Sequence, residues 1–353
     1  MKIAILGAGH GGTAAAGDLA LKGHEIRLYE AEEFSESFAP IRKSKEVIIN
    51  ENGEKKTAQL ADATHNPGEA ISGAELVLVI VPAFAQKSIA QKCAPYFSND
   101  QYVFLIPGGF GSYIFSKELA RAGVKPVLGE TATLPYGTRK TGGNEVSIFI
   151  RTIFNPFAAF PSTQNETASR LLKELYPEIE TMENVLDVAL NNTNPCVHPV
   201  PTVLSASRIE YAGDNFWLYR EAMTPSIWRV MRKVDEERIQ VRKGFGFGDP
   251  HCRMPEETGR VFADQFGYEG IKAGRQMKGP EKLDHRYITE DVPMGLVFYS
   301  DMGKLVNVGT PTVDAIIELS SQLLERDFRA EGRNLEFLGL EGYEANALLR
   351  ELQ

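Results

Sequence analysis

The stretch MKIAILGAGHGGTAAAGDLALKGHEIRLYE (1–30) decides the fold of this chain. It begins with a short apolar run, KIAIL (2–6), continues into a glycine-rich turn and an alanine-rich helical pattern, and ends with a second run, EIRLYE (25–30). A strand, a glycine turn, a helix and a second strand in this order form a βαβ unit. The sequence therefore predicts a parallel sheet that starts with this unit.

The turn after the first strand has the composition of a phosphate-binding site. It reads Gly7-Ala-Gly9-His-Gly11-Gly12 and matches the pattern G-x-G-x-x-G/A. Gly7 permits the tight turn, Gly9 lets a diphosphate approach the backbone, and Gly12 lets the helix pack closely. The first amides of the helix attract the phosphates. We predict that Gly7, Gly9, His10, Gly11 and Gly12 bind a dinucleotide, with His10 exposed in the turn rather than catalytic.

An acidic residue closes the second strand and separates this turn from a chance cluster of glycines. Glu30 lies a little over twenty residues beyond the turn, where a carboxylate accepts hydrogen bonds from the adenosine ribose. The same carboxylate would repel a 2′-phosphate, and Ala31 follows it where an NADP site often has Arg or Ser. Arg27 should point elsewhere from its place in the strand. The predicted cofactor is NAD, which is favoured over NADP.

Strands and helices continue to alternate after this unit. Further apolar runs occupy residues 75–81, 102–106 and 126–129, and helical patterns occupy 84–94 and 112–122. Strands that are apolar throughout and separated by helices indicate a parallel sheet covered on both faces, a doubly wound Rossmann-type domain. Ligands bind beyond the carboxyl ends of such strands. Pro82 and Ala83 after one strand and Gly108 after the next are therefore predicted to border the nicotinamide.

The end of this domain is predicted in less detail. We expect a loop over 131–144, a strand over 146–152 and an edge strand over 157–160. A helix should begin near Ser162, with Thr163 and Glu166 spaced as a capping box. From about residue 183 long helical patterns replace the strands. The predicted domains are thus a dinucleotide-binding domain over 1–182 and a mostly α-helical domain over 183–353 that provides the substrate and catalytic site.

Composition excludes several classes of function. The 353 residues carry a net charge of −9 and no dense run of Lys and Arg, which argues against nucleic acid as a partner. Three dispersed cysteines argue against a disulfide framework, and no C-x-x-C or H-x-x-x-H spacing indicates a metal site. Neither a signal segment nor an apolar stretch of ~20 residues is present. We expect a cytoplasmic protein that binds neither membrane nor metal.

Two segments of the second half resemble the opine dehydrogenase family, which includes the octopine and N-(1-carboxyethyl)-amino-acid dehydrogenases. They are LNNTNPCVHPVPTVLSASRIE (190–210) and HRYITEDVPMGLVFYSDMGKLVNVGTPTVDAII (285–317), whose most specific elements are N-x-x-x-H-P and R-Y-x-x-E-D-V-P. The resemblance extends to the GAGHGG turn, the VPAF loop, GET at 129–131 and the C-terminal RDFRAEGRNLEFLGL. It implies an NADH-dependent enzyme that condenses a 2-oxo acid such as pyruvate with an amino acid and reduces the imine to a secondary amine.

The resemblance also implies roles for individual residues. His198 matches the family's catalytic histidine, a group suited to moving protons near neutral pH, and Asp291 matches the carboxylate that pairs with it. Arg286 matches the arginine that holds the oxo acid, and its planar fork suits a carboxylate. Asn194, one turn before His198, and Thr131, at a strand end, are weaker candidates for hydrogen bonds to substrate.

Each assignment has a structural alternative. A histidine before proline is often satisfied by a backbone carbonyl, Asp291 could cap a helix, and most arginines form surface ion pairs. Arg208 and Arg139 are further candidate cations, more typical of ion pairs. The aromatic stretch Tyr211, Phe216, Trp217 and Tyr219 is more typical of core packing than of substrate recognition.

Two other functions stay open on the sequence. A 2-hydroxy acid or ketopantoate-type dehydrogenase also joins a dinucleotide domain to a helical one, but such enzymes use a lysine, and the helix predicted over 184–199 has none. A non-catalytic NAD sensor would need Gly7, Gly9 and Glu30 alone. The amino acid, the oxo acid, the direction, the stereochemistry and the choice between monomer and homodimer are not set by the sequence.

Overall fold

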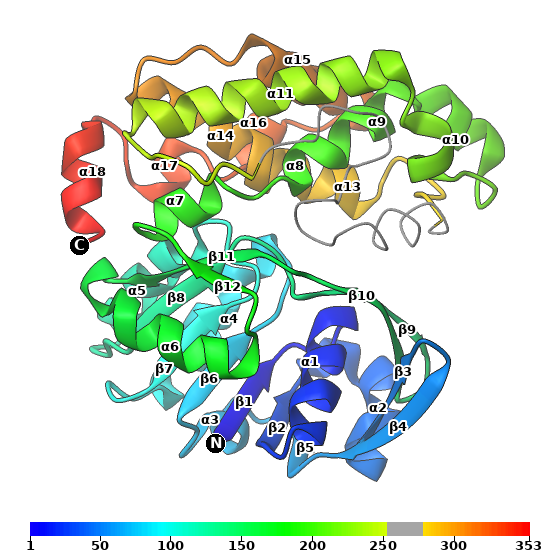
Figure 1. Ribbon diagram of the computed structural model, residues 1–353, viewed down its shortest axis with the longest axis vertical. Coiled ribbons are helices and arrows are strands. Elements are labelled where there is room, and N and C mark those ends of the chain that lie inside the picture. Colours follow the sequence, from blue (N-terminus) through cyan, green and yellow to red (C-terminus); the bar gives the residue numbers. More distant parts are fainter. Residues whose placement is uncertain (253–277) are drawn as a thin grey trace. The chain divides into compact units, whose positions relative to one another are not determined.

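The computed structural model describes residues 1–252 and 278–353 (Figure 1). The chain divides into two compact units, Met1–Val188 and Ala189–Gln353, so most of helix α7 (Val185–Ala189) belongs to the first. The predicted boundary after residue 182 lies slightly before this division. Within the described ranges, no helix is both long enough and apolar enough to cross a bilayer.

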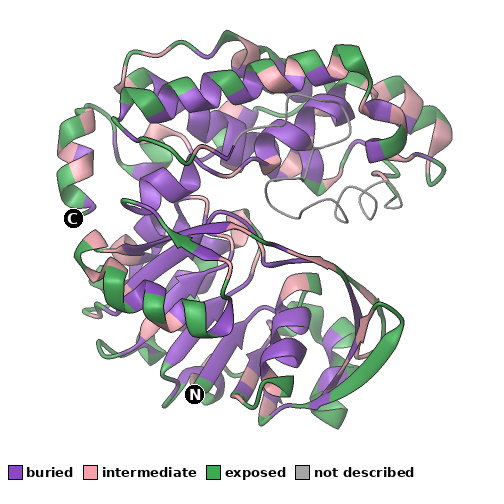
Figure 2. Cartoon of the chain, in the orientation of Figure 1, coloured by how far each residue is buried: buried purple, intermediate pink, exposed green. Residues whose placement is uncertain are grey.

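The first unit is built on a sheet of eight strands. In sheet order these are β12 (Ile179–Thr181), β11 (Asn155–Phe160), β8 (Val127–Thr131), β7 (Tyr102–Leu105), β6 (Leu76–Val79), β1 (Lys2–Leu6), β2 (Glu25–Tyr29) and β5 (Asp62–Thr64). All neighbours are parallel except β11 and β8. The central strands β1 and β6 are buried apart from Lys2 at the start of β1 (Figure 2), which confirms the predicted doubly wound domain.

Helices cover both faces of this sheet. Alternate residues of each strand point to opposite sides, and both sides are apolar, so both must be covered. Ile3 and Ile5 of β1 join one apolar core, and Ala4 and Leu6 join the other. The helices are α1 (His10–Leu21), α2 (Ser35–Ser44), α3 (Pro67–Ile71), α4 (Gln86–Cys93), α5 (Gly111–Arg121) and α6 (Asn165–Leu175). Short 3-10 turns are η1 (Glu32–Phe34), η2 (Ala83–Ala85), η3 (Ala94–Tyr96) and η4 (Ser162–Gln164).

Three local predictions for residues 131–175 were wrong. The predicted edge strand at 157–160 is β11, which lies inside the sheet because β12 pairs with its outer side. The predicted loop over 131–144 contains strand β9 (Tyr136–Gly142). The predicted capping box is not formed, because α6 starts at Asn165 without a side-chain cap. The Asn165 side chain instead accepts a hydrogen bond from the amide of Ala159 in β11.

A second sheet of four strands packs against α1. Its order is β4 (Glu54–Gln59), β3 (Glu46–Glu51), β10 (Glu145–Arg151) and β9, with a parallel pair at its centre, β3 and β10. Val47 and Ile49 of β3 join the core beneath α1. A Cβ atom on Gly17 would lie 2.6 Å from Ile49 and 2.8 Å from Val47, so this close approach requires glycine. Helix α1 is therefore packed between two sheets.

A buried polar cluster joins the second sheet to α1. The Tyr136 hydroxyl donates to Asp18 at 2.8 Å, and Arg151 pairs with Asp18 at 2.8 Å and with Glu51 at 2.7 Å. Burial by itself would raise the pKa of Asp18, but hydrogen bonds and charges from Arg151, with Lys22 and Tyr136, hold it below its usual value. The cluster fixes the open end of the β9–β10 hairpin, where Tyr136 pairs with Arg151, relative to α1.

The described part of the second unit is helical. It contains α8 (Asn194–Val197), α9 (Pro199–Leu204), α10 (Ala206–Ala212), η5 (Leu218–Ala222), α11 (Pro225–Gly244), α13 (Arg286–Thr289), η6 (Val292–Leu296), α14 (Val297–Leu305), α15 (Pro311–Leu324), α16 (Phe328–Glu331), α17 (Leu335–Leu338) and α18 (Ala345–Glu351). The turns η5 and η6 are π-helical. The single helix predicted over 184–199 was wrong: α7 ends at Ala189, and two new short helices begin at Asn194 and Pro199, with Pro195 in the first turn of the former.

Long helix α11 organises this unit through buried charges. Arg238 is fully buried and pairs with Asp235 at 2.7 Å, and it also donates to the carbonyls of Leu190 and Cys252. The Glu237 carboxylate accepts the amides of Thr312 and Val313 at the start of α15. These contacts connect α11 to the segment that precedes α8 and to the start of α15.

Candidate active site

The glycine turn has the shape that a dinucleotide needs. Gly7 has a φ of +106°, and a Cβ there would lie 2.4 Å from the carbonyl oxygen of Ile80. A Cβ on Gly12 would lie 1.8 Å from the carbonyl oxygen of Gly7. Glycine at this position therefore lets the start of α1 pack against the backbone of the turn. At Gly9, no described atom lies within 4 Å of such a position. The backbone of Gly9 is thus open to a ligand, and α1 begins directly after it.

The Glu30 carboxylate lies against this turn. It accepts the amide of Ala8 at 2.7 Å and its neighbour's amide, that of Ala31, at 2.9 Å. His65, at the end of β5, contacts the Glu30 carbonyl through Nδ1 at 2.8 Å. The carboxylate is therefore fixed beside the predicted diphosphate position, as a ribose anchor must be.

A lysine from the second sheet, which was not predicted as a site residue, also lies at this turn. The Lys140 ammonium, on β9, is 3.2 Å from the Ser37 carbonyl and 3.5 Å from the Ala8 carbonyl. Burial lowers the pKa of this ammonium, and the nearby Glu30 carboxylate opposes that effect. The Lys140 amide donates to Nδ1 of His10, which is exposed in the turn as expected. The turn therefore has one carboxylate and one ammonium beside it.

A buried carboxylate forms hydrogen bonds with the loop that follows β7. Glu130 is fully buried and accepts the amides of Phe110 at 2.6 Å and Ser112 at 2.9 Å, and the Ser112 hydroxyl at 2.5 Å. The Gln86 side chain donates to the carbonyl of Gly108 at 3.0 Å. Gly108 lies so close to Glu130 that a Cβ atom on the glycine would be 2.3 Å from the Cβ atom of Glu130. Glu130 thus caps α5 and fixes the loop.

Thr131 follows Glu130 and is almost fully buried. Its hydroxyl donates to the Thr133 carbonyl at 2.8 Å. The hydroxyl hydrogen is already used inside the first unit, so a bond to substrate would need the oxygen as an acceptor. Pro82 follows the end of β6 after two residues and precedes the η2 turn, which begins at Ala83.

The second unit brings His198 and Asp291 together from segments far apart in the sequence. His198 lies between α8 and α9, and Asp291 immediately precedes η6. Their Nδ1 and Oδ2 atoms are 2.8 Å apart, and their side chains are only 12% and 9% exposed. Asp291 makes no side-chain cap, and Nδ1 of His198 meets a carboxylate rather than a backbone carbonyl. The structural alternatives for both residues are therefore wrong.

Two tyrosines complete the surroundings of the imidazole. The Tyr219 hydroxyl, from η5, is 3.1 Å from Nε2 of His198. The Tyr287 ring, from α13, stacks on the imidazole with centroids 4.0 Å apart and 13° between the planes. Of the aromatic stretch read as core packing, Phe216 and Tyr219 are buried, whereas Tyr211 is 89% exposed. Core packing is therefore wrong for Tyr211, and Tyr219 has a polar contact that aromatic spacing could not indicate.

The other predicted residues of this unit lie nearby. Arg286 opens α13, its side chain is 60% exposed, and its Nε is 3.1 Å from the Glu290 carboxylate. Asn194 starts α8 one turn before His198, and its carbonyl accepts the His198 amide at 3.0 Å. Arg208 pairs with Glu221 at 2.9 Å, as expected for an ion pair.

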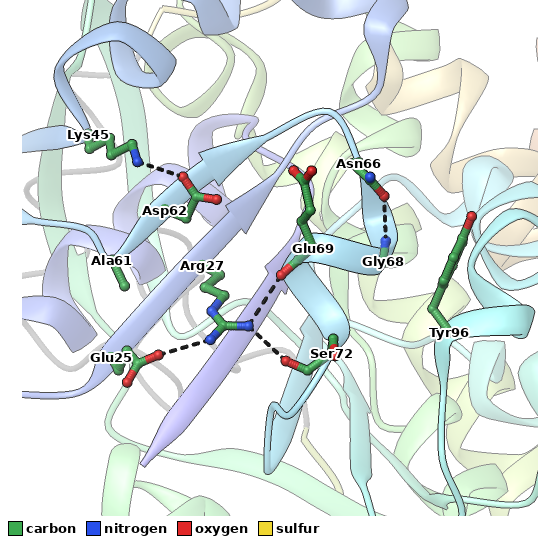
Figure 3. A pocket seen from close by; sticks show the side chains of 10 residues that line it. All are labelled: Glu25, Arg27, Lys45, Ala61, Asp62, Asn66, Gly68, Glu69, Ser72 and Tyr96. Carbon is green, nitrogen blue, oxygen red and sulfur yellow. Dashed lines mark hydrogen bonds and ion pairs between the residues drawn. The ribbon is translucent and has the colours of Figure 1, made fainter.

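A charged hollow lies at the opposite end of the first sheet (Figure 3). Glu25 is the first residue of β2, so the hollow belongs to the amino edge of the strands, whereas dinucleotides bind at the carboxyl edge. Arg27 bonds to Glu25 and to the Ser72 carbonyl, and Lys45 pairs with Asp62 at 2.9 Å. These charges satisfy one another, and Arg27 points away from Glu30 as predicted.

Comparison with known proteins gives matches to both units. The family model for the NAD-dependent glycerol-3-phosphate dehydrogenase N-terminus matches residues 2–128, and that for the NAD/NADP octopine/nopaline dehydrogenase alpha-helical domain matches residues 181–324. An opine dehydrogenase of Arthrobacter sp. (strain 1C) is 35% identical and aligns over 97% of this chain and 96% of its own.

Solved structures share the fold. Octopine dehydrogenase with NADH and pyruvate has a TM-score of 0.76 and 19% identity, covering 99% of this chain and 98% of its own. A ketopantoate reductase from Ralstonia eutropha JMP134 is more distant, with a TM-score of 0.62, 18% identity, and coverage of 92% and 99%.

Proposed function

The chain belongs to the opine dehydrogenase family, and from this premise we propose that its chemistry takes place at the pair His198 and Asp291. As a member, it is an NAD-dependent oxidoreductase that acts on the CH–NH bond of secondary amines. It catalyses the reductive condensation of a 2-oxo acid with an amino acid, and the reverse oxidation. The observation that supports the proposed site is the nearly buried contact of 2.8 Å between an imidazole and a carboxylate.

Formation of the imine needs a group that accepts and releases protons. The amine must lose a proton when its nitrogen attacks the oxo carbon, and the carbonyl oxygen must gain protons to leave as water. Asp291 accepts a hydrogen from Nδ1 of His198 and so leaves Nε2 as the nitrogen that exchanges protons. Bound NADH supplies the hydride that reduces the imine carbon. His198 is therefore proposed as the acid and base, and Asp291 as the residue that orients it.

The remaining roles follow from charge and position. Arg286 is proposed to hold the carboxylate of the oxo acid, because its guanidinium is largely exposed and keeps donors beyond the Nε used by Glu290. Pyruvate is the proposed oxo acid, since the similar octopine dehydrogenase was solved with it. Asn194 and Thr131 stay weaker proposals for substrate contacts. A cytoplasmic location is also proposed, and it agrees with three buried cysteines that form no disulfide.

The cofactor site proposed for NAD comprises the glycine turn, Glu30 and the loops that contain Pro82, Ala83 and Gly108. The open backbone at Gly9 fits a diphosphate, and the fixed Glu30 carboxylate fits the two ribose hydroxyls. A simple 2-hydroxy acid or ketopantoate dehydrogenase is the alternative, and only similarity of fold supports it.

One assay separates these functions. NADH oxidation is followed by absorbance with pyruvate alone, with pyruvate and each of the amino acids in turn, and with neither. We expect oxidation that requires both pyruvate and an amino acid. An equal rate without the amino acid would favour the 2-hydroxy acid function and overturn the proposal.

Lys140 is proposed as a further cofactor residue, since its ammonium lies beside the turn and Glu30. We expect Lys140→Met to raise the KM for NADH about tenfold, as for loss of one charged hydrogen bond, with kcat at saturating NADH unchanged. The matched control is Lys56→Met on β4 of the same sheet, where Lys56 pairs with exposed Glu54. Equal KM values in the two variants would remove Lys140 from the site.

A further inference from the structure

We propose that Tyr219 is a positioning residue of the reaction, which donates its phenolic hydrogen to Nε2 of His198 and keeps that nitrogen ready to accept a proton. The inference rests on the proposed role of His198. It starts from a contact of 3.1 Å between the Tyr219 hydroxyl and Nε2, on the side of the ring opposite Asp291. Carboxylate, imidazole and phenol thus form one continuous chain of hydrogen bonds.

The direction of each bond in this chain follows from the chemistry of its members. An ionised carboxylate can only accept, so Nδ1 of His198 has the hydrogen when the imidazole is neutral. A neutral imidazole has a single N–H, which leaves a lone pair on Nε2. The phenol must then be the donor. Burial raises the pKa of Tyr219 well above its usual value, so this hydrogen is present at neutral pH.

The fold holds the phenol at this place. Tyr219 belongs to the π-helical turn η5. This geometry is rare in proteins, and where it occurs it is often found at functional sites. The Glu221 carboxylate in the same turn accepts the Trp217 amide at 3.1 Å and pairs with Arg208. The stacked Tyr287 ring covers one face of the imidazole. Rotation of the His198 ring is therefore opposed by Asp291, Tyr219 and Tyr287 together.

These contacts have opposite effects on the charge of the imidazole. Asp291 favours the imidazolium, whereas a hydrogen bond donated to Nε2 favours the neutral ring. Besides Asp291, Tyr287 and Arg286 are described groups that act on the Tyr219 hydroxyl, and Arg286 pairs with Glu290, which directly follows α13. In the direction that oxidises an opine, water adds to the imine carbon and loses a proton, and Nε2 of the neutral ring accepts this proton as the Tyr219 hydroxyl gives up its bond to that nitrogen. Tyr219 should thus extend activity to lower pH in this direction.

The test is Tyr219→Phe, which keeps the ring and removes only the hydroxyl. It is assayed by NAD reduction with the opine formed from pyruvate and the amino acid that gives the highest rate. We expect kcat to fall about three- to tenfold, as for loss of one neutral hydrogen bond, and the acidic limb of its pH profile to move to higher pH. The control is Tyr211→Phe, because Tyr211 is exposed in the same unit. A pH profile of Tyr219→Phe that superimposes on the wild type would overturn the inference.

A spectroscopic measurement does not depend on turnover. The chain has six histidines, and ¹⁵N spectra of the labelled full-length protein identify His198 by its loss in His198→Asn. The Nε2 resonance should move in Tyr219→Phe and stay in Tyr211→Phe, and an unmoved resonance in both would contradict the proposed bond. The two proposals fail differently: an active His198→Asn overturns the function of His198, whereas inactive His198→Asn with an unshifted Tyr219→Phe profile overturns only the role of Tyr219.

Discussion

His198→Ala should lower turnover by about 10²- to 10⁴-fold while the protein still binds NADH, as expected for loss of a proton-transfer group. The imidazole lies in the second unit, whereas the glycine turn and Glu30 belong to the first, so the substitution leaves the proposed cofactor residues intact. Turnover is measured with pyruvate and the preferred amino acid, and NADH binding is measured by its fluorescence.

His24→Ala is the matched control for this variant. His24 lies between α1 and β2 in the first unit, and its Nδ1 is 3.5 Å from the amino terminus of the chain. It should keep wild-type turnover. Unchanged turnover in His198→Ala would exclude the residue from the mechanism, and loss of NADH binding would indicate damage beyond proton transfer.

Glu130→Ala should lower the free energy of unfolding of the first unit by about 3–5 kcal/mol, because it leaves several buried donors without their acceptor and opens a cavity. Two of these donors are the amides of Phe110 and Ser112 at the start of α5. The KM for NADH should rise as well, since the loop at Gly108 depends on the same carboxylate. Urea unfolding of the full chain, followed by circular dichroism, measures the change.

Glu166→Ala provides the comparison for Glu130. Glu166 is 87% exposed and pairs with Arg170 one turn along α6, a surface pair of the kind that contributes about 0.3–0.5 kcal/mol. If both variants unfolded at the same urea concentration, Glu130 would not support the loop as described.

The sequence was sufficient to predict those parts of the fold in which the pattern of apolar residues matches the pattern of buried residues. Strand β1 is apolar on both faces because both cores use it, and the turn at Gly7 follows it with the required spacing. The second sheet was not predicted. Strand β4, EKKTAQ (54–59), is exposed at four successive positions, and β9, YGTRKTG (136–142), consists mostly of Gly, Thr and basic residues, so neither has the alternation of a half-buried strand.

The candidate site was predictable only in part. His198 and Asp291 were paired from family resemblance, because no local spacing connects residues 93 positions apart. Lys140 lies on a strand that was read as a loop, and Tyr219 was read as packing. Glu130 belongs to the GET motif, but its capping bonds depend on the return of β8 beside α5. Pro195 and Pro199 were available signals for the breaks in the predicted helix.

The packing of α1 between two sheets places the two charged groups of the proposed cofactor site on different sheets. Glu30 comes from the main sheet, and Lys140 comes from a hairpin that the main sheet does not contain. Exchange of the hairpin between homologous enzymes would therefore move Lys140 alone, while the strand that Glu30 follows stays unchanged. The two charges of the proposed cofactor site can thus be varied independently of each other.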